Sequence, residues 1–332
     1  MKICIIKLGA DGDVLRTLPI VKAIKDKYPN SEITWVAKGD IIELLRGNSG
    51  ITKVISLPYE ERQSFDILYN FDIDEEACNL AMSIDAKEKY GFYFENKYPL
   101  AFNVRAEYYL NTLFDDYLKK TNNKTYQEMM FEVAELSYEK EPYIITLNGE
   151  DIKYARNFAE NNNIKNEKLV GIHLGASSRW PSKVWNEERL KEFIRKVKEK
   201  DYEILLFGGP NEIDWHHKLA KELENQGIKI FRNNPNNTKR EFLSLVSLCK
   251  AMICSDSFSL HVSLALQKPT IGLFFCTSPE EVEGYNLLRK ITSKMQKDFF
   301  PERMNEYNEE LTKSISADDV LSALEDIMKN KS

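Results

Sequence analysis

The chain alternates short apolar runs rich in β-branched residues with segments of helical periodicity, and this alternation constrains its fold more than any other feature. The first run, KICIIKL at 2–8, precedes a small-residue loop, and apolar residues then recur at helical spacing over 14–24. Further strands are predicted at 32–37, 53–57 and 65–71. Because parallel strands need a crossover segment between them, strands that alternate with helices predict a parallel α/β sheet.

A second series of the same kind follows the polar stretch at 160–168. Its strands are predicted at 169–174, 203–207, 228–231, 251–254 and 270–274, and its helices at 187–198, from the GGPNE turn to about 224, and at 239–249, 257–266 and 318–330. Two such series predict two Rossmann-like domains, 1–150 and 151–332, that face each other across a cleft. Ligands of such folds bind at the carboxyl ends of the parallel strands.

The segment 75–140 is less regular and rich in aromatic residues. Much of it has an amphipathic pattern, which predicts helix, for example over 105–119. The Tyr and Phe residues between 90 and 117 are suited to stack on sugar faces, but a place in the core is the favoured interpretation.

Charge and apolar composition exclude several functions. Lys and Arg total 46 against 52 Asp and Glu, and the net charge of −6 offers no basic field for nucleic acid. No apolar run approaches the roughly 18 residues of a membrane span. The N-terminal stretch is interrupted by Lys7 and lacks a signal-peptide cleavage site. Five scattered cysteines without a CxxC pair predict buried thiols in a cytoplasmic protein.

The charge is unevenly divided. Residues 1–150 carry 18 basic and 25 acidic side chains, a net of −7, and the remaining 28 and 27 give +1. The C-terminal half is therefore the better host for an anionic ligand.

The loop 9–13, GADGD, separates the first strand from its helix. It lacks the full GxGxxG spacing and places two carboxylates where a dinucleotide pyrophosphate would lie, which argues against NAD. A carboxylate here can cap the helix or act as a general base. Asp11 and Asp13, like Asp72 and Asp74, also match the DxD pattern of metal-dependent sugar transferases, but this pattern is common by chance and a metal role is not favoured.

Three further loops follow strands of the second series. Small residues, hydroxyls and Arg179 in GASSRWPS at 175–182 suit a phosphate, and the glycine pair before Glu212 permits close approach of a ligand. The segment from Ser255 to His261 is a second candidate anion site at the start of a helix. Each also has an ordinary structural interpretation, as a turn or, for His261, as a packing residue.

Together these loops resemble glycosyltransferase family 9, the heptosyltransferase family, which has a GT-B fold of two Rossmann-like domains. The resemblance rests on KICIIKLGADGDVLRTLP, GASSRWPSKVW, GGPNE and SDSFSLHVSLALQKPTIGLFFCTSP. It spans both halves and is weakest over 60–165. In such a fold the final helix, 318–330, is expected to pack back on the N-terminal domain.

The resemblance implies an inverting, metal-independent transfer of a sugar from a nucleotide sugar, typically ADP-heptose, to a hydroxyl of a glycan or other surface-polymer acceptor. No cofactor is implied, and the protein is expected to work in the cytoplasm or peripherally at the inner membrane face. Asp13 matches the family's proposed base, and Gly12 and Arg16 are assigned to the acceptor. The residues assigned to the donor are Ser177, Ser178, Arg179, Lys183, Gly208, Glu212, Asp256, Ser257, Phe258 and His261.

The chain departs from the family pattern at three points. Ser178 stands where members often carry a lysine, and Phe258 replaces the glycine of an Asp-Thr-Gly motif. The negative N-terminal half suggests an acceptor less anionic than a phosphorylated lipid A core, such as a surface glycan or a protein hydroxyl. A nucleotide-sugar epimerase of similar fold and a non-catalytic nucleotide-sugar-binding protein are the alternatives.

Overall fold

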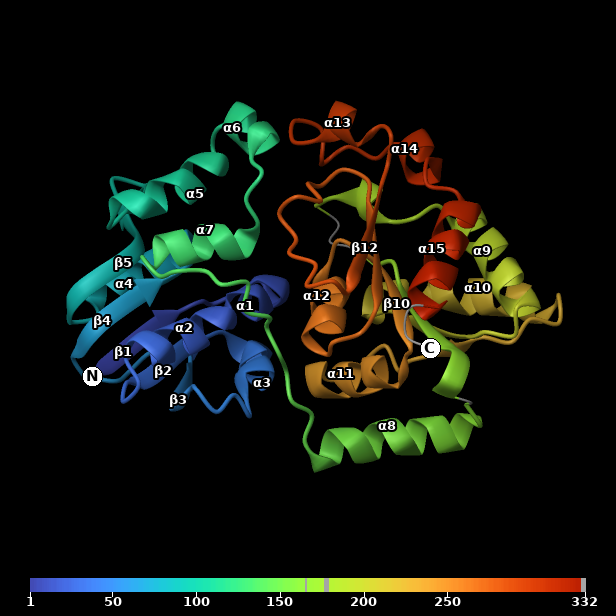
Figure 1. Cartoon of the computed structure of the whole chain (residues 1–332), viewed down its shortest axis with the longest axis horizontal. Coiled ribbons are helices and arrows are strands. Elements are labelled where there is room, and N and C mark those ends of the chain that lie inside the picture. Colours follow the sequence, from blue (N-terminus) through green and yellow to red (C-terminus); the bar gives the residue numbers. More distant parts are fainter. Residues whose placement is uncertain (165, 176–178, 330–332) are drawn as a thin grey trace. The chain divides into compact units, whose positions relative to one another are not determined.

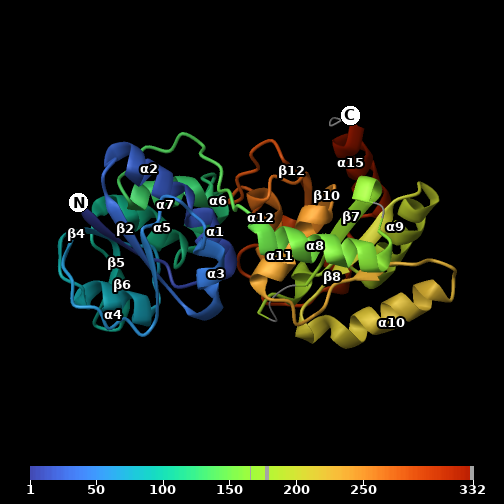
Figure 2. The same ribbon diagram turned by 90° about the horizontal axis from the view of Figure 1, so that it is seen from below.

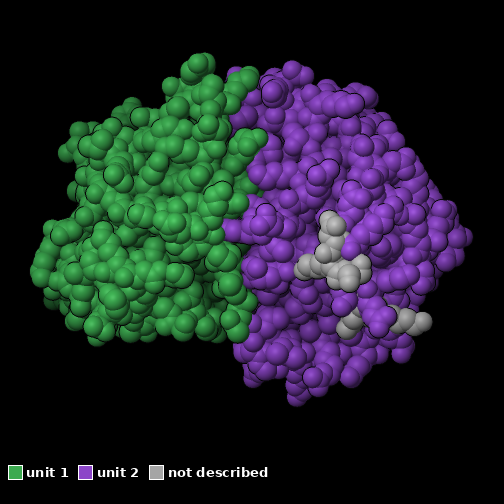
Figure 3. All heavy atoms as spheres, viewed as in Figure 1, with its two compact units in different colours: residues 1–146, 280–283 green, residues 147–279, 284–332 purple. Residues whose placement is uncertain are grey.

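A computed structural model describes residues 1–164, 166–175 and 179–329. The chain divides into two compact units (Figure 3). Unit 1 comprises Met1–Thr146 and Glu280–Glu283, and unit 2 comprises Leu147–Pro279 and Gly284–Ser332. Each unit has its own sheet covered by helices (Figure 1), and both sheets confirm the predicted α/β class. In the described part of the chain, no helix has the length and apolar character that crossing a bilayer requires.

The sheet of unit 1 has the strand order β3-β2-β1-β4-β5-β6. Strands β1 to β5 pair in parallel and β6 is antiparallel to β5. The strands are β1 (Lys2–Ile6), β2 (Glu32–Ala37), β3 (Lys53–Ser56), β4 (Phe65–Asn70), β5 (Ala86–Glu95) and β6 (Tyr98–Ala101). The β5–β6 hairpin was not predicted. It turns at Asn96 and Lys97, which both have positive φ, as a two-residue turn of this kind requires.

The helices of unit 1 are shorter than predicted. They are α1 (Asp11–Thr17), α2 (Pro19–Lys27), α3 (Ile42–Leu45), α4 (Glu75–Ser83), α5 (Glu107–Thr112), α6 (Asp116–Thr121) and α7 (Tyr126–Val133). The single helix expected over 14–24 is divided because Pro19 begins a new helix and has no N–H to continue the old one. The helix expected over 105–119 is also divided, since the Asp115 carboxylate caps α6 by accepting a hydrogen bond from the Leu118 N–H.

The sheet of unit 2 has the order β12-β11-β10-β7-β8-β9, and all its pairs are parallel. Its strands are β7 (Leu169–His173), β8 (Glu203–Phe207), β9 (Phe231–Arg232), β10 (Ala251–Ser255), β11 (Thr270–Phe274) and β12 (Leu288–Thr292). Strands β10 and β11 are fully buried, which explains their continuous apolar sequences. The edge strand β12 was not predicted, because its sequence LRKIT mixes exposed charged residues with apolar ones.

The helices of unit 2 are α8 (Gly149–Asn162), α9 (Glu187–Glu199), α10 (Ile213–Glu224), α11 (Lys239–Leu248), α12 (Phe258–Ala265), α13 (Gln296–Phe299), α14 (Glu309–Lys313) and α15 (Ala317–Lys329). Helix α8 lies along α11 (Figures 1 and 2). Helix α15 belongs to unit 2, where it packs on α9 and the sheet, and the expectation that it also packs back on the N-terminal domain stays a prediction. Its apolar face, with Val320 and Leu324, is buried in the core of unit 2.

In both sheets the first strand lies in the middle, and the strand order changes direction next to it. The switch points lie between β1 and β4 in unit 1 and between β7 and β10 in unit 2. At a switch point, the loops that leave neighbouring strands run to opposite sides of the sheet and leave a crevice for a ligand. Three of the four predicted loops leave these central strands and therefore border the crevices.

Candidate functional site

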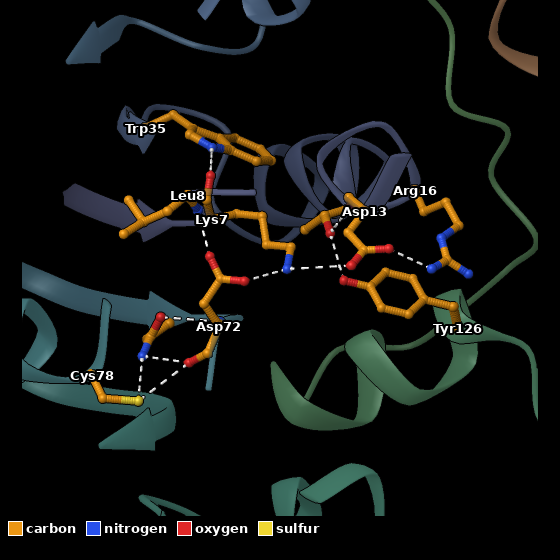
Figure 4. Close-up of polar contacts among 10 residues, drawn as sticks. Lys7, Leu8, Asp13, Arg16, Trp35, Asp72, Cys78 and Tyr126 are labelled. Carbon is orange, nitrogen blue, oxygen red and sulfur yellow. Dashed lines mark hydrogen bonds and ion pairs between the residues drawn. The ribbon is translucent and has the colours of Figure 1, made fainter. Parts of the chain in front are cut away.

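An ion pair occupies the switch point of unit 1 (Figure 4). Lys7 follows β1 and Asp72 follows β4, and the Lys7 ammonium bonds the Asp72 carboxylate. The second oxygen of this carboxylate accepts a hydrogen bond from the Leu8 N–H. The two side chains are only 4% and 6% exposed. Burial alone would lower the pKa of Lys7, but Asp72 and, to a smaller extent, Asp13 raise it well above its ordinary value, so the lysine is charged.

The buried Asn70 holds Asp72 in position. Its amide donates to the carbonyl of Asp72 at 3.0 Å and to that of Phe92 at 2.7 Å. Its side-chain oxygen accepts a hydrogen bond from the Asp72 N–H at 3.1 Å. The last residue of β4 therefore ties the loop that carries Asp72 to β5, and this leaves the carboxylate little freedom.

Asp13 is the third residue of α1 and is 31% exposed, far more than Lys7 or Asp72. One of its oxygens bonds Arg16, and the other lies 3.9 Å from the Lys7 ammonium. The helix is capped by Ala10, without a side-chain hydrogen bond. Asp13 is therefore not the helix cap, and its carboxylate faces two cations while part of it remains accessible to a ligand.

Helix α7 closes this cluster from another side (Figure 4). The Arg16 guanidinium lies 4.0 Å from the centre of the Tyr126 ring, and the Tyr126 hydroxyl is 3.3 Å from that of Thr17. Burial raises the pKa of Tyr126, so its hydroxyl stays protonated. Gly12 lies beside Asp13 in the first turn of α1. The structure thus places the three N-terminal candidates, Gly12, Asp13 and Arg16, on one short helix.

In unit 2, the residue after β10 meets the loop after β7. Lys183, at the end of a short 3-10 helix, donates hydrogen bonds to the backbone oxygen of Asp256 at 2.9 Å and to its carboxylate at 3.2 Å. The Lys183 ammonium lies 4.4 Å and the Arg179 guanidinium 5.1 Å from the centre of the Trp180 ring. The structure therefore brings two of the predicted donor residues to one indole, and it joins Lys183 to a third, Asp256. Ser177 and Ser178, which were also assigned to the donor, lie outside the described residues.

Helix α12 begins beside this group. The hydroxyl of Ser257, its N-cap, is 3.0 Å from that of Ser259. The Phe258 ring stacks on Phe242 with centroids 5.7 Å apart, so it is anchored to α11. His261 lies inside the helix and is buried.

The end of β8 is shaped by close packing. Gly208 abuts the His216 ring, and any side chain at this position would overlap the imidazole. The Glu212 carboxylate accepts a hydrogen bond from the Gly209 N–H at 2.8 Å. It also lies close enough to Gly175 that a Cβ there would be 3.0 Å from a carboxylate oxygen. Glu212 thus lies beside the loop that follows β7.

Two histidines at this edge are held neutral. Burial lowers the pKa of His173 and of His216 to about 4. Among the described residues, neither the Nδ1 of His173 nor the Nε2 of His216 finds a hydrogen-bond partner. Neither histidine was among the predicted site residues; Lys7 was missed as well, and Asp72 was considered only as part of a DxD pattern. The sequence signal for the Lys7–Asp72 pair is a lysine and an aspartate that each follow an apolar strand.

The chain is similar in sequence to a family of known proteins. Residues 61–311 match the model of glycosyltransferase family 9 (heptosyltransferase). The chain is 25% identical to lipopolysaccharide heptosyltransferase 1 of Campylobacter coli over 305 residues, which is 83% of this chain and 84% of that protein. It is 20% identical to lipopolysaccharide heptosyltransferase 2 of Escherichia coli K12 over 84% of each chain.

Solved structures share the fold. A family 9 glycosyl transferase from Veillonella parvula DSM 2008 superposes with a TM-score of 0.80 at 19% identity, covering 99% of this chain and 97% of that one. The E. coli ADP-heptose lps heptosyltransferase II gives 0.74 at 17% identity, over 100% and 99%. These matches confirm the expected GT-B class. The family match covers about three quarters of the sequence, and the chain therefore belongs to glycosyltransferase family 9, the heptosyltransferase family, and is a glycosyltransferase.

Proposed function

We propose that this protein transfers a heptose from ADP-heptose to a hydroxyl group of an acceptor glycan or protein, with inversion at the anomeric carbon and without a metal ion. The relatives' names, lipopolysaccharide heptosyltransferases 1 and 2, support the sugar and the acceptor class. The observation that carries the mechanism is the partly exposed Asp13 carboxylate between two cations at the switch point of unit 1. The family match begins at residue 61, so the role of Asp13 rests on this geometry and on the sequence resemblance.

In this proposal unit 2 binds the donor. Its carboxyl edge offers Lys183 and Arg179 for the diphosphate, since ammonium and guanidinium groups stabilise the charge that develops on a leaving phosphate. Asp256, already held by Lys183, can accept hydrogen bonds from sugar hydroxyls. Glu212 is assigned to the ribose, Ser257 to the phosphates and His261 to support of helix α12.

In unit 1, Asp13 acts as the general base. The acceptor oxygen attacks the anomeric carbon from the face opposite the diphosphate, its proton passes to the Asp13 carboxylate, and the bond from carbon to the diphosphate oxygen breaks to release ADP. A carboxylate held beside Lys7 and Arg16 is ionised before the reaction, as a base must be. Gly12, which has no side chain, is assigned to the acceptor.

The absence of a metal in the proposed reaction is supported by what one carboxylate of each DxD motif contacts. Asp72 bonds Lys7, and Asp13 bonds Arg16 and lies near Lys7. Ammonium and guanidinium groups thus already provide positive charge at the places where a divalent cation would be bound. That the protein works in the cytoplasm or binds peripherally at the inner membrane face stays a prediction. Co-sedimentation with anionic vesicles tests the membrane binding.

The test is release of ADP from ADP-heptose with a heptose-free lipopolysaccharide core as acceptor, with its phosphates present or removed, and with or without EDTA. Asp13→Asn is expected to lower kcat by about 10²- to 10⁴-fold, the usual contribution of a general base, while ADP-heptose still raises the melting temperature. Asp26→Asn on the exposed face of α2 is the matched control and should be fully active. Full activity of Asp13→Asn would refute the assignment of the base, and loss of activity in EDTA would refute metal independence.

A further inference from the structure

Resting on the proposed role of Asp13, we infer that Lys7 and Asp72 form a buried positioning pair that sets both the place and the basicity of the Asp13 carboxylate. Neither residue touches the acceptor in this proposal. Lys7 acts on Asp13, and Asp72 acts on Lys7.

The register of β1 on β4 and hydrogen bonds to Asp72 hold the pair in place. The register of β1 against β4 aligns Ile6 with Asn70, so Lys7 and Asp72 leave the sheet one and two residues beyond the last aligned pair. Asp72 is held by the Leu8 N–H and by Asn70. The lysine chain is 4% exposed, and its ammonium has one carboxylate in direct contact and a second at 3.9 Å. A side chain enclosed in this way cannot swing toward a ligand, which distinguishes it from a substrate-binding lysine.

The charges explain why two carboxylates share one ammonium. Asp13 faces Lys7 and Arg16, and the neighbouring Tyr126 and Tyr109 are neutral because burial raises the pKa of both hydroxyls. Two adjacent cations would stabilise the ionised carboxylate so strongly that it would be a weak base. Asp72 takes the closer contact with Lys7 and so reduces the effect of this ammonium on Asp13.

Removing the two partners should therefore have opposite effects. Lys7→Met removes a cation near Asp13 and leaves two carboxylates facing each other, so Asp13 should take up its proton at higher pH. Asp72→Asn removes the competing negative charge, and an amide oxygen attracts an ammonium less strongly than a carboxylate does, so Lys7 should move closer to Asp13. Asp13 should then take up its proton at lower pH. A pair with only a structural role would weaken the fold in both variants without opposite shifts.

The experiment is a carbon-13 NMR titration of the aspartate carboxyl groups in the full chain, with the Asp13 signal assigned by its loss in Asp13→Asn. The midpoint of Asp13 is expected to rise by at least about one pH unit in Lys7→Met and to fall in Asp72→Asn. Where turnover is measurable, the acid limb of kcat/KM should move in the same directions while the KM for ADP-heptose is unchanged. Lys22→Met, which breaks the exposed Lys22–Asp26 pair of α2, is the control and should shift nothing.

Lys7→Met leaves Asp72 buried without its cation and is the variant most at risk of misfolding. The double variant Lys7→Met/Asp72→Asn removes both charges and keeps the hydrogen bond from the Leu8 N–H, so it provides a folded form without the ammonium. Its Asp13 midpoint should also lie above that of the wild type. Equal midpoints in the wild type, Asp72→Asn and the double variant would overturn the inference. An active Asp13→Asn would instead overturn the proposed function and leave the titration result standing.

Discussion

Acid should destabilise unit 2 through two neutral histidines that lie at the carboxyl ends of β7 and β8. His173 and His216 have an ordinary pKa of 6.5 when the chain is unfolded and of about 4 in the folded protein. The folded state resists protonation because each buried ring nitrogen would become an N–H⁺ donor with no acceptor among the described residues. The unfolded chain accepts these protons freely. The stability that depends on the neutral rings is therefore complete above pH 6.5 and is lost as the pH falls toward 4.

The size of the effect follows from the interval between the two pKa values. At pH 5 each imidazole is almost fully protonated in the unfolded chain and about one tenth protonated in the folded one, which costs about 2 kcal/mol of unfolding free energy per histidine. Both together cost about 4 kcal/mol, a large share of the 5–15 kcal/mol that holds a typical domain folded.

The assay is urea unfolding at pH 7 and pH 5, followed by the fluorescence of Trp180, Trp185 and Trp215, which all lie in unit 2. The double variant His173→Asn/His216→Asn keeps polar side chains that do not titrate in this range. Between pH 7 and pH 5, the wild type is expected to lose about 4 kcal/mol more than this variant. Any acid loss due to carboxylates occurs in both proteins and cancels in the comparison. Equal losses in the two proteins would refute the reasoning.

Two further substitutions test the sites themselves. Lys183→Met should weaken ADP binding, measured by calorimetry, at least about tenfold, because it removes a charged hydrogen-bond donor. The control Lys196→Met, on the surface of α9, should bind ADP normally. Unchanged affinity in Lys183→Met would exclude this lysine from the donor site. Gly91→Ala should lower the unfolding free energy by about 2 kcal/mol or more, because Gly91 has φ +96° and a Cβ there would overlap the Asn70 backbone. Gly149→Ala, with no atom within 4 Å of its Cβ, should be neutral, and equal stability of the two variants would contradict this explanation.

The sequence was most informative where strands are buried on both faces. Strands β2, β8 and β11 have the predicted bounds, because a continuous apolar run between turn residues leaves little choice. It was least informative at edges and in short segments. The hairpin of β5 and β6 and the strand β12 carry charged and exposed residues, and their position depends on a neighbouring strand. Division of a helix at Pro19 could have been predicted, since the residue before a proline disfavours continuation of the helix.

The same distinction applies to the candidate site. Loops that follow strands and precede helices could be located in the sequence, and with them Asp13, Lys183 and Asp256. The pairing of Lys7 with Asp72 could not, because the residues are 65 positions apart and meet only through the register of β1 on β4. Likewise, nothing in the sequence around Lys183 indicates that its ammonium bonds the residue after β10.

The arrangement of charges at the switch point of unit 1 bears on which acceptor the protein takes. Lys7 and Arg16 each contact a carboxylate, so the positive charges of this cluster are already paired with acidic side chains. An acceptor phosphate placed there would meet a locally neutral cluster within a segment, 1–150, whose net charge is −7. Binding such a phosphate would therefore require cations drawn away from Asp13 and Asp72, which costs the contacts that hold the base in place. A neutral sugar or protein hydroxyl imposes no such cost, so we expect an acceptor with few phosphates.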